Sequence, residues 1–397
     1  MLKASVSIPH VAVLLPLSLK GHLDVFEGIL DYVRLHGPWQ LYRMEGRPGE
    51  QKLIDLKRWG CTGLIVGDCT PPEAKLFCHT KMPIVVLEPS PAMRKPSHPL
   101  AKKPSLRVDS RAIGVLAARF FLERHYTRFA FVGESHGLYW SQEREAGFLK
   151  TLASAGNTCA IYPAPKTHEQ SDWATEHLHM QRWLKALVKP VALFAAMDGR
   201  ARQVLDACMS AGISVPQEIA VLGVDDDPFI CNATFPTLSS IQTNGKKAGY
   251  LLAEHLNQLM NGQRAKRWDT QIEPLRVTER RSTDATAIAD PKVAKALEYI
   301  WQEAGQHAVT VSDVVKQFSS SRRFAEIHFK SIVGRTIMEE IRRVKLDRVC
   351  SLLAETNLSI GEITWQCGFK RESHLAYLFQ KHFAMSMSAY RIASRHG

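Results

Sequence analysis

The segments VSDVVKQFSSSRRFAEIHFKSIVG (311–334) and LSIGEITWQCGFKRESHLAYLFQKHF (358–383) repeat one pattern in the C-terminal part of the chain. In each, a short helix with apolar periodicity is followed by a small turn, Ser319 to Ser321 or Cys367 to Gly368. A second helix with basic residues on its outward face comes next. This order is typical of a helix-turn-helix, although any two packed helices joined by a tight turn can imitate a single copy. The tandem repeat therefore predicts a double helix-turn-helix unit.

The residues between the two copies predict one amphipathic helix. Ile337 to Glu355 contains neither Gly nor Pro, and its apolar residues recur at helical spacing. At about 1.5 Å per residue such a helix is roughly 28 Å long, close to the roughly 34 Å between successive major-groove faces of B-DNA. A rod of this length could present the second helix of each copy to one side of a duplex.

This C-terminal segment resembles the DNA-binding domain of the arabinose-regulator (AraC/XylS) family, from about Asp290 to Arg391. The matching positions are Ser321-Arg322-Arg323, Phe329-Lys330, Gly334, the helix Arg343 to Leu353, Ser359-Ile360, Glu362-Ile363, Gly368-Phe369, Phe379, Lys381, Phe383 and Tyr390-Arg391. Four packing and turn positions depart from the family pattern: Ala325, Leu375, Ala384 and Met387.

The resemblance implies which residues contact DNA. Those of the first copy are Arg322, Arg323, Glu326, Ile327 and Lys330, and those of the second are Lys370, Arg371, Glu372, Ser373, His374, Tyr377 and Lys381. Arginine can bind guanine with two hydrogen bonds and glutamate can accept from cytosine, whereas Lys330 and Lys381 are expected at phosphates. For Arg322 and Arg371, a solvated charged face is the alternative.

Length and composition agree with a DNA-binding protein of several domains. A chain of 397 residues is too long for one compact core. The net charge of +12 favours an acidic partner such as double-stranded DNA. Eight cysteines form no CxxC pair, so we expect no zinc site and no disulfide framework, and scattered reduced thiols suit the cytoplasm. No cofactor is expected. The apolar run from Val11 to Leu19 contains Pro16 and predicts a buried first strand rather than a signal peptide or a membrane span.

Before the helical part, short apolar runs alternate with amphipathic stretches. Strands are expected at Val11 to Leu15, Gln40 to Arg43, Gly63 to Val66, Ile84 to Leu87, Arg128 to Val132, Val191 to Ala196 and Ile219 to Val224. Helices are expected at Val25 to Leu35, Ala112 to Arg124, Arg200 to Ala211 and Lys246 to Met260. This alternation predicts mostly parallel sheets covered by helices.

Two irregular segments divide the chain. The Pro-rich basic patch from Pro89 to Pro104 is interpreted as a solvated surface loop, with a DNA-touching arm as the alternative. The polar stretch Arg280 to Pro291 is interpreted as a linker. We therefore expect an effector-binding domain over residues 1–285 and a DNA-binding domain over residues 286–397.

A second resemblance covers the effector part. The motifs Ala211 to Pro216, Ile219 to Asp226, Pro236 to Leu238, Gly245 to Ala248 and Arg281 to Thr283 are similar to the inducer-binding core of lactose/galactose (LacI/GalR) repressors and periplasmic sugar-binding proteins. The implied fold is an α/β two-lobed periplasmic-binding-protein-like domain followed by an all-α double helix-turn-helix domain. A sugar domain ahead of a doubled helix-turn-helix resembles the xylose operon regulator (XylR) family, as do Trp140 with Glu143 to Glu145, Asp198 with Arg200 to Arg202, and Glu279 to Thr283.

Two carboxylates are candidates for binding the effector. Asp198 follows the strand from Val191, and Asp225 follows the strand from Ile219. Two-lobed α/β domains bind ligands at the carboxyl ends of their strands, and an ionised carboxylate accepts from adjacent sugar hydroxyls. The alternatives are a helix N-cap for Asp198 and a solvated turn residue for Asp225.

Three further residues complete the predicted effector site. Arg144 stands where the sugar-repressor family places an arginine on ligand hydroxyls, although a surface ion pair with Glu143 or Glu145 is the alternative. Trp140 and Phe229 could stack on the apolar face of a sugar or belong to the ordinary core.

The loop after the first strand leaves the identity of the effector open. Residues 16–22 (PLSLKGH) offer Ser18, Lys20 and His22. A lysine and a histidine would suit a phosphorylated or acidic effector, or they could be solvated.

Together these features predict a transcriptional regulator controlled by a small sugar, D-xylose or a related pentose. A homodimer on a double-stranded operator is expected, RNA polymerase is a further candidate partner, and no membrane is involved. An enzyme fused to a DNA-binding domain is the weaker alternative, because the chain has no GxSxG, P-loop, GxGxxG or HExxH motif and no paired metal ligands. An architectural DNA protein without effector control would leave the α/β domain unexplained.

Overall fold

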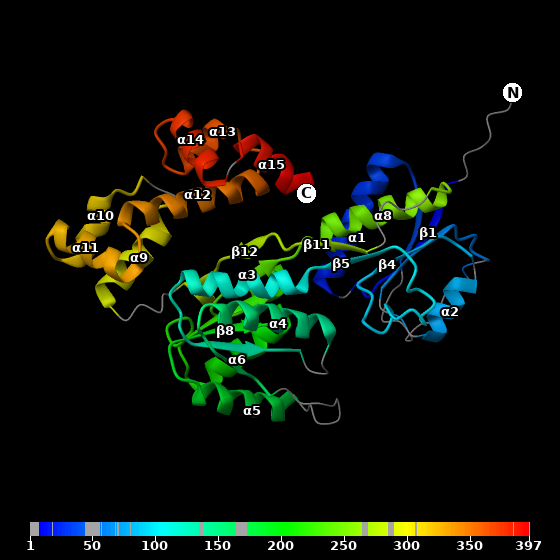
Figure 1. Cartoon of the computed structure of the whole chain (residues 1–397), viewed down its shortest axis with the longest axis horizontal. Helices are drawn as coiled ribbons and strands as arrows, with labels where there is room; N and C mark the ends of the chain where they lie inside the picture. The colour runs from blue at the N-terminus through cyan, green and yellow to red at the C-terminus, as the bar shows by residue number, and fades with distance from the viewer. Residues whose placement is uncertain are drawn as a thin grey trace.

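The computed structural model describes residues 8–17, 19–43, 56, 58–67, 69, 71–79, 81–134, 138–163, 173–263, 269–284, 290–305, 308–383 and 385–396. These residues form two α/β lobes followed by a helical unit (Figure 1). The predicted fold class is therefore confirmed. The predicted boundary at residues 285/286 lies outside the described ranges.

The first lobe contains a six-stranded parallel sheet with the order β11-β5-β4-β3-β1-β2. Its strands are β1 (His10–Leu14), β2 (Gln40–Arg43), β3 (Gly63–Val66), β4 (Ile84–Leu87), β5 (Ser105–Val108) and β11 (Asp269–Ile272). The helices of this lobe are α1 (Lys20–His36), α2 (Pro71–His79) and α8 (Gly245–Met260). The central strands β1, β3 and β4 are nearly continuous apolar runs, as expected for parallel strands that are covered on both faces.

The second lobe contains a six-stranded sheet with the order β12-β10-β9-β8-β6-β7, in which only β12 runs antiparallel to its neighbour. Its strands are β6 (Phe129–Val132), β7 (Cys159–Ile161), β8 (Val191–Ala195), β9 (Ile219–Val224), β10 (Ser239–Gln242) and β12 (Arg276–Thr278). Its helices are α3 (Ser110–Glu123), α4 (Tyr139–Ser154), α5 (Trp173–Ala186), α6 (Asp198–Ala211), the short α7 (Pro228–Cys231) and the 3₁₀ turn Arg281–Thr283.

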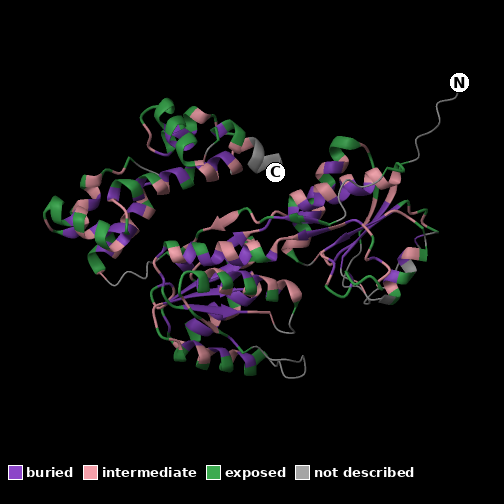
Figure 2. Ribbon diagram, viewed as in Figure 1, coloured by how far each residue is buried: buried purple, intermediate pink, exposed green. Residues whose placement is uncertain are grey.

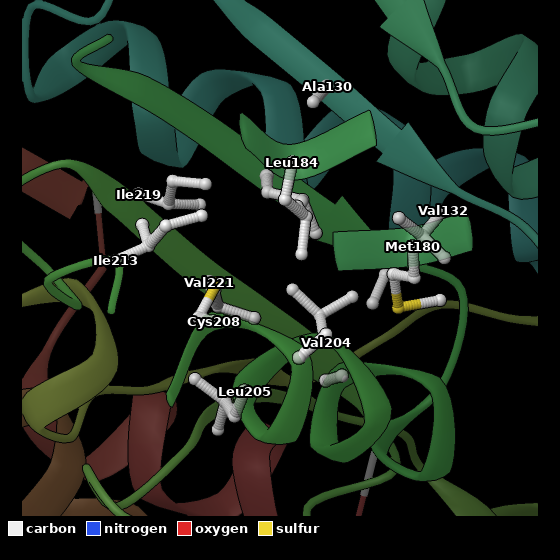
Figure 3. Packing of buried hydrophobic residues seen from close by; sticks show 14 of the residues in the cluster. Ala130, Val132, Met180, Leu184, Val204, Leu205, Cys208, Ile213, Ile219 and Val221 are labelled. Carbon is white, nitrogen blue, oxygen red and sulfur yellow. The ribbon is translucent and has the colours of Figure 1, made fainter. Parts of the chain in front are cut away.

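The core of the second lobe lies on both faces of its sheet. On one face, Leu184 of α5 and Val204 of α6 pack against Val221 of β9 and its neighbours (Figure 3). On the other face, phenylalanines of α3, α4 and the strands form an aromatic cluster. Both faces of the sheet are covered by apolar side chains. The polar residues that can face the other lobe are therefore those at the ends of the strands.

Glycines let paired helices approach closely in both lobes. A Cβ atom added at Gly114 of α3 would lie 2.0 Å from the carbonyl oxygen of Arg144 in α4, and one at Gly147 of α4 would lie 2.1 Å from that of Arg111. Gly249 of α8 approaches α1 in the same way, with the carbonyl oxygen of Val25 at 1.8 Å. The contacts of Gly114 and Gly147 hold α4, and with it the residues at its N-terminus, close against α3.

The C-terminal unit is wholly helical in its described residues, and its parts are α9 (Pro291–Glu303), α10 (Val311–Val315), the 3₁₀ turn Lys316–Phe318, α11 (Arg322–Val333), α12 (Ile337–Glu355), α13 (Ile360–Gln366), α14 (Glu372–Phe383) and α15 (Met387–His396). The predicted helix from Ile337 to Glu355 has the bounds of α12. Three helices begin with capping boxes, at Thr310, Thr336 and Ser359, in which the residue three positions later is acidic.

The double helix-turn-helix has two separate cores joined by α12. One surrounds Phe318 and Phe329, and the other surrounds Leu375 and Phe379. Of the positions that depart from the family pattern, Ala325 and Leu375 are fully buried and Met387 is nearly so, whereas residue 384 lies outside the described part of the chain. Ala325, Leu375 and Met387 therefore still pack in the core, although they differ from the residues that the family has at these positions.

The structure corrects the sequence prediction in two places. The chain from Pro89 to Pro104 forms successive turns, as a loop would, but Met93 and Leu100 within it are buried, so it is not wholly solvated. The strands β5, β7, β10, β11 and β12 were not predicted. In β5 and β10, the apolar character is interrupted by Arg107 and by Ser239 and Ser240.

We expect the substitution Gly114→Ala to destabilise the second lobe. Its methyl group would overlap the carbonyl of Arg144, and overpacking of this kind costs about 1–3 kcal/mol. Gly21→Ala in α1 is the matched control, because nothing lies within 4 Å of the added atom and helix propensity gains up to about 1 kcal/mol. Thermal unfolding followed by circular dichroism should show a lowered midpoint for the first variant only. Equal midpoints would contradict the packing argument.

Candidate effector cleft and nucleic-acid interface

Arg144 is the centre of the candidate effector site. It lies in the first turns of α4, and its side chain is buried, with 8% exposure. Its Nη1 donates to the carbonyl oxygen of Ala196 at the end of β8, its Nη2 lies 3.9 Å from Oδ1 of Asp225, and its guanidinium lies over the ring of Trp140 at 4.7 Å. The alternative of a surface ion pair with a neighbouring glutamate is therefore wrong.

Asp225 lies in a strained turn that directs it to Arg144. Its φ is +104° and that of Asp226 is +51°, in the region that L residues rarely adopt. The turn is held because the amide of Asp225 donates to the carbonyl of Ile241 at 2.9 Å. Burial raises the pKa of the Asp225 carboxyl to about 6, while the nearby Arg144 acts in the opposite direction. Asp225 is thus a turn residue, but its carboxylate is only 24% exposed and faces a cation.

Asp198 is fully buried and is tied to its own lobe. It is the first residue of α6, not the N-cap, and it is 1% exposed. Its Oδ1 accepts from Oγ of Ser240 at 2.6 Å, and its Oδ2 accepts from the amide of Asp227 at 2.8 Å and from Sγ of Cys231 at 3.4 Å. Burial, followed by the charge of Asp225, raises the pKa of Asp198 to about 8. Asp225 therefore lines the pocket between the lobes, whereas Asp198 is buried behind it, and no direct contact joins Asp198 to Arg144 in the described residues.

Glu88 is a cleft residue that the sequence analysis missed. It follows β4 in the first lobe at a φ of +50°, and its carboxylate accepts from the amide of Val108. The hydroxyl of Tyr139 donates to the carbonyl of Glu88 at 2.9 Å and lies 3.0 Å from its Oε2, so this pair joins the first lobe to α4. Burial raises the pKa of the Glu88 carboxyl, and its charge acts on Arg144. The signal was available, because Glu88 follows a buried strand as Asp198 and Asp225 do.

The first lobe contributes charged residues from α1. Lys20 forms an ion pair with Asp24, and the charges of both act on Asp225. A pocket of about 610 Å³ lies here and is lined by Lys20, Asp24, Glu27, Asp31, Leu35, Asp225, Asp226, Gln242, Thr243, Asn244, Lys246, Lys247, Tyr250, Leu251 and Leu275. His22 is bound to the carbonyl of Pro16 at 3.1 Å and burial lowers its pKa, whereas Ser18 lies outside the described residues.

The two predicted aromatic residues lie in different settings. Trp140 packs against the aromatic core of the second lobe and presents its ring face to Arg144. Phe229 lies on α7, next to the cap residue Asp227, and its side chain is 86% exposed. The structure therefore brings Trp140, Arg144 and Asp225 together, and it leaves Phe229 outside this group.

The first candidate recognition helix, α11, begins at a defined cap. Ser321 accepts from the amide of Phe324, and Ser319 before it adopts the left-handed conformation of the turn. Arg322 forms an ion pair with Glu326 at 2.8 Å, so this glutamate is engaged within the helix. Arg323, Ile327 and Lys330 are exposed.

The second candidate recognition helix, α14, presents its predicted residues to solvent as well. All seven are exposed: Lys370, Arg371, Glu372, Ser373, His374, Tyr377 and Lys381. The turn before it is held by Lys345 of α12, whose ammonium donates to the carbonyl of Gly368 at 3.1 Å. Figure 2 shows exposed residues along the outer faces of both helix-turn-helix units, with α12 between them.

The part of the chain that the structure describes contains no group of three or more His, Cys, Asp or Glu side chains that could hold a metal ion. None of its helices is both long and apolar enough to cross a bilayer.

Two family models match the chain. A periplasmic binding protein-like domain matches residues 118–283, and a helix-turn-helix domain matches residues 314–393. These matches confirm the predicted combination of a sugar-binding type of fold with a helix-turn-helix domain.

Curated proteins and a solved structure match over most of the chain. The xylose operon regulatory protein of Haemophilus influenzae is 31% identical over 333 residues, 83% of this chain and 84% of that protein. The protein of the same name from Escherichia coli K12 is 28% identical over 371 residues, 93% of each chain. A structure of the xylose-binding transcription activator xylR is 26% identical, has a TM-score of 0.62 and covers 99% of this chain and 100% of its own. These relatives are transcription regulators, not enzymes, and the chain belongs to the family of xylose operon regulatory proteins.

Proposed function

We propose that this chain is a cytoplasmic DNA-binding transcriptional regulator whose effector is D-xylose or a closely related sugar. One observation carries the proposal: a buried Arg144–Asp225 pair lies in the cleft of a two-lobed domain that is followed by two exposed recognition helices. Residues 1–285 would sense the sugar and residues 286–397 would bind a double-stranded operator. The family relationship supports this assignment.

The chemistry of the cleft suits the hydroxyl groups of a sugar. Arg144 can donate two parallel hydrogen bonds to neighbouring hydroxyls, and Asp225 can accept from them. Trp140 lies against the other side of the guanidinium and limits how Arg144 can turn. Asp198 would act by holding the Asp225 turn, and Phe229 could reach the sugar only if the cleft changes shape. Glu88 would contribute from the facing lobe, where the hydroxyl of Tyr139 in α4 is its partner.

A neutral sugar is favoured over a sugar phosphate, which is the alternative effector. The pocket between the lobes is lined by the carboxylates of Asp24, Glu27, Asp31, Asp225 and Asp226, against three lysines. Lys20 and Lys246 are already paired with Asp24 and Glu27, so the pocket offers an added phosphate few cations that carboxylates do not already engage.

Contacts lead from the cleft to the DNA-binding unit. Thr278 and Arg280 of the β12 segment hold the carboxylate of Asp226, both at 2.8 Å. Between them in sequence, Glu279 forms an ion pair with Arg124, whose guanidinium lies 5.2 Å from the ring of Trp301 in α9. These contacts support a mechanism in which sugar binding repositions the DNA-binding unit, provided that the sugar binds one arrangement of the lobes more tightly.

On DNA, α11 and α14 would enter successive major grooves from one face, since α12 spans roughly 28 Å at about 1.5 Å per residue. A homodimer would place two such units on a paired operator. The exposed side chains of Leu19, Leu23 and Leu30, which share one face of α1, support a contact with a second copy. RNA polymerase is proposed as a further partner of the bound dimer.

We expect the substitution Arg144→Lys to weaken D-xylose binding about 10- to 100-fold, because a lysine keeps the charge and loses the paired donors. Isothermal calorimetry on the full chain, with D-xylose, L-arabinose, D-glucose and D-xylose 5-phosphate, measures this effect and ranks the effectors. Arg202→Lys, in an exposed ion pair with Asp206 on α6, is the matched control and should bind as the wild type does. Heat from none of these compounds would remove the sugar-sensing role.

Sugar affinity should fall as the pH falls through about 6. The raised pKa of Asp225 means that its carboxyl becomes protonated in that range, and the ionised form is the better acceptor. Well below pH 6 the loss approaches tenfold per pH unit, measured by calorimetry between pH 4.5 and 7.5, whereas Asp225→Asn should bind weakly with no such slope. A flat wild-type profile would contradict this role.

The stability of the sugar-free protein should change in the opposite sense. The folded-state pKa of Asp225 lies above its ordinary value of 3.8, so the folded chain keeps a proton that the unfolded chain has lost. The contribution of Asp225 to the free energy of unfolding is therefore present below about pH 4 and is lost as the pH rises through 6.

On DNA, the substitutions Arg323→Ala and Lys330→Ala should have different effects. Losing a base contact of Arg323 should cost about 1–3 kcal/mol of specific binding and relax sequence preference. Losing a phosphate contact of Lys330 should weaken binding to all sequences and reduce the salt slope by about 1. Fluorescence anisotropy with a selected and a scrambled duplex over a salt series separates the two. The control is Arg34→Ala, which removes a 73% exposed arginine on α1. If the Arg323→Ala variant kept the sequence preference of the wild type, α11 would not be the helix that contacts the bases.

A further inference from the structure

The exposed face of α11 is partly apolar. Phe324 is 50% exposed and Ile327 is 61% exposed, and residues three apart lie on the same side of a helix. The opposite side is used by the core, where Ala325, Phe329 and Val333 are buried. These two large apolar side chains therefore lie outside the buried core of the unit.

The ring of Phe324 is held in a defined position. It stacks on the imidazole of His328 with a centroid distance of 5.0 Å and an interplanar angle of 22°. His328 is in turn bound to the carboxylate of Asp290 at 2.8 Å, next to the start of α9. These contacts hold the ring of Phe324 in one orientation on the surface of α11.

The corresponding face of α14 is polar. Glu372 and Ser373 occupy its first turn, and Tyr377, which is 63% exposed, carries a hydroxyl group. The two recognition helices therefore differ in chemistry, and only α11 carries an apolar pair on its outward side among the residues described.

Charge indicates what covers this pair. Arg323 and Lys330 are exposed on the same helix beside Ile327, and Lys316 nearby is 74% exposed. A cationic border suits the phosphates on either side of a major groove more than an apolar protein surface. Within that groove, the apolar group on the base edges is the C5 methyl of thymine.

We propose that Phe324 and Ile327 read thymine methyl groups, so that the half of the operator bound by α11 is selected for thymine at the contacted positions. This inference rests on the proposed function, because it assumes that α11 lies in the major groove. Arg323 would supply the adjacent polar contact, and α14 would read its half through hydrogen bonds.

Deoxyuridine tests the proposal, because it differs from thymidine by this methyl group alone. Duplexes that bind are first selected from random DNA with the full-length chain and D-xylose, and each thymine of the consensus is then replaced by deoxyuridine. We expect about a fourfold loss of affinity per contacted methyl, from the transfer free energy of one such group. The losses should cluster in one half of the site.

A double-variant comparison identifies the side chains involved. Phe324→Ala with Ile327→Ala should bind the thymine duplex more weakly and show no further loss with deoxyuridine, as for two sites that share one interaction. Met209→Ala on α6, a 63% exposed apolar side chain, is the matched control and should keep the full deoxyuridine effect. Circular dichroism of both variants verifies folding.

The outcomes are distinct. Deoxyuridine losses that persist unchanged in the double variant would overturn the inference, as would wild-type binding that is insensitive to deoxyuridine. Failure to enrich any sequence would overturn the proposed function itself, which separates that result from the loss of the methyl contact alone.

Discussion

The buried carboxylate of Asp198 is the constraint on which the cleft of the second lobe depends. It joins the start of α6 to Ser240 of β10, to the amide of Asp227 and to Cys231 of α7. A buried carboxyl group is costly unless hydrogen-bond partners surround it, and here three partners from different segments converge on its two oxygens. Gly223 of β9 completes the site, because a Cβ atom there would lie 2.2 Å from Oδ1. Strand ends, helix start and turn are thereby fixed together.

The strained turn close to Asp198 places the carboxylate of Asp225 opposite the buried guanidinium of Arg144. Asp225 and Asp226 both adopt positive φ, which costs on the order of 1–3 kcal/mol per residue where the surroundings do not compensate. The compensation comes from both sides: Arg280 and Thr278 hold Asp226, and Arg144 faces Asp225. At 3.9 Å, Arg144 and Asp225 are near each other without the geometry of a tight pair. Both therefore keep hydrogen-bonding capacity that a hydroxylated ligand can use.

The sequence was sufficient for the fold wherever periodicity and composition agreed. α12 and β9 have the predicted bounds, because one is an uninterrupted amphipathic run and the other a continuous apolar run. β10 escaped prediction because its buried Ser239 and Ser240 are made tolerable only by partners far along the chain, such as Ser282. The effector site could be predicted only in part, again because its contacts join residues that lie far apart in the sequence. The rule that polar residues follow buried strands finds candidate residues. It does not distinguish Asp198, which is bonded within its own lobe, from residues that face the cleft, because that distinction depends on hydrogen-bond donors far along the chain.

The position of β12 gives the molecule a physical connection between cleft and output. This strand is the antiparallel edge of the second sheet, and the residue directly after it, Glu279, forms an ion pair with Arg124. Arg124 is nearly buried, lies 3.6 Å from the ring of Phe120 beneath it, and faces Trp301 of the helical unit. Since Trp301 donates to Glu340 of α12 at 2.9 Å, α12 and the edge strand share one cluster. In the proposed mechanism, a sugar that changes the Asp226 turn would act on α12 through this cluster to the extent that it binds the two arrangements with different affinity.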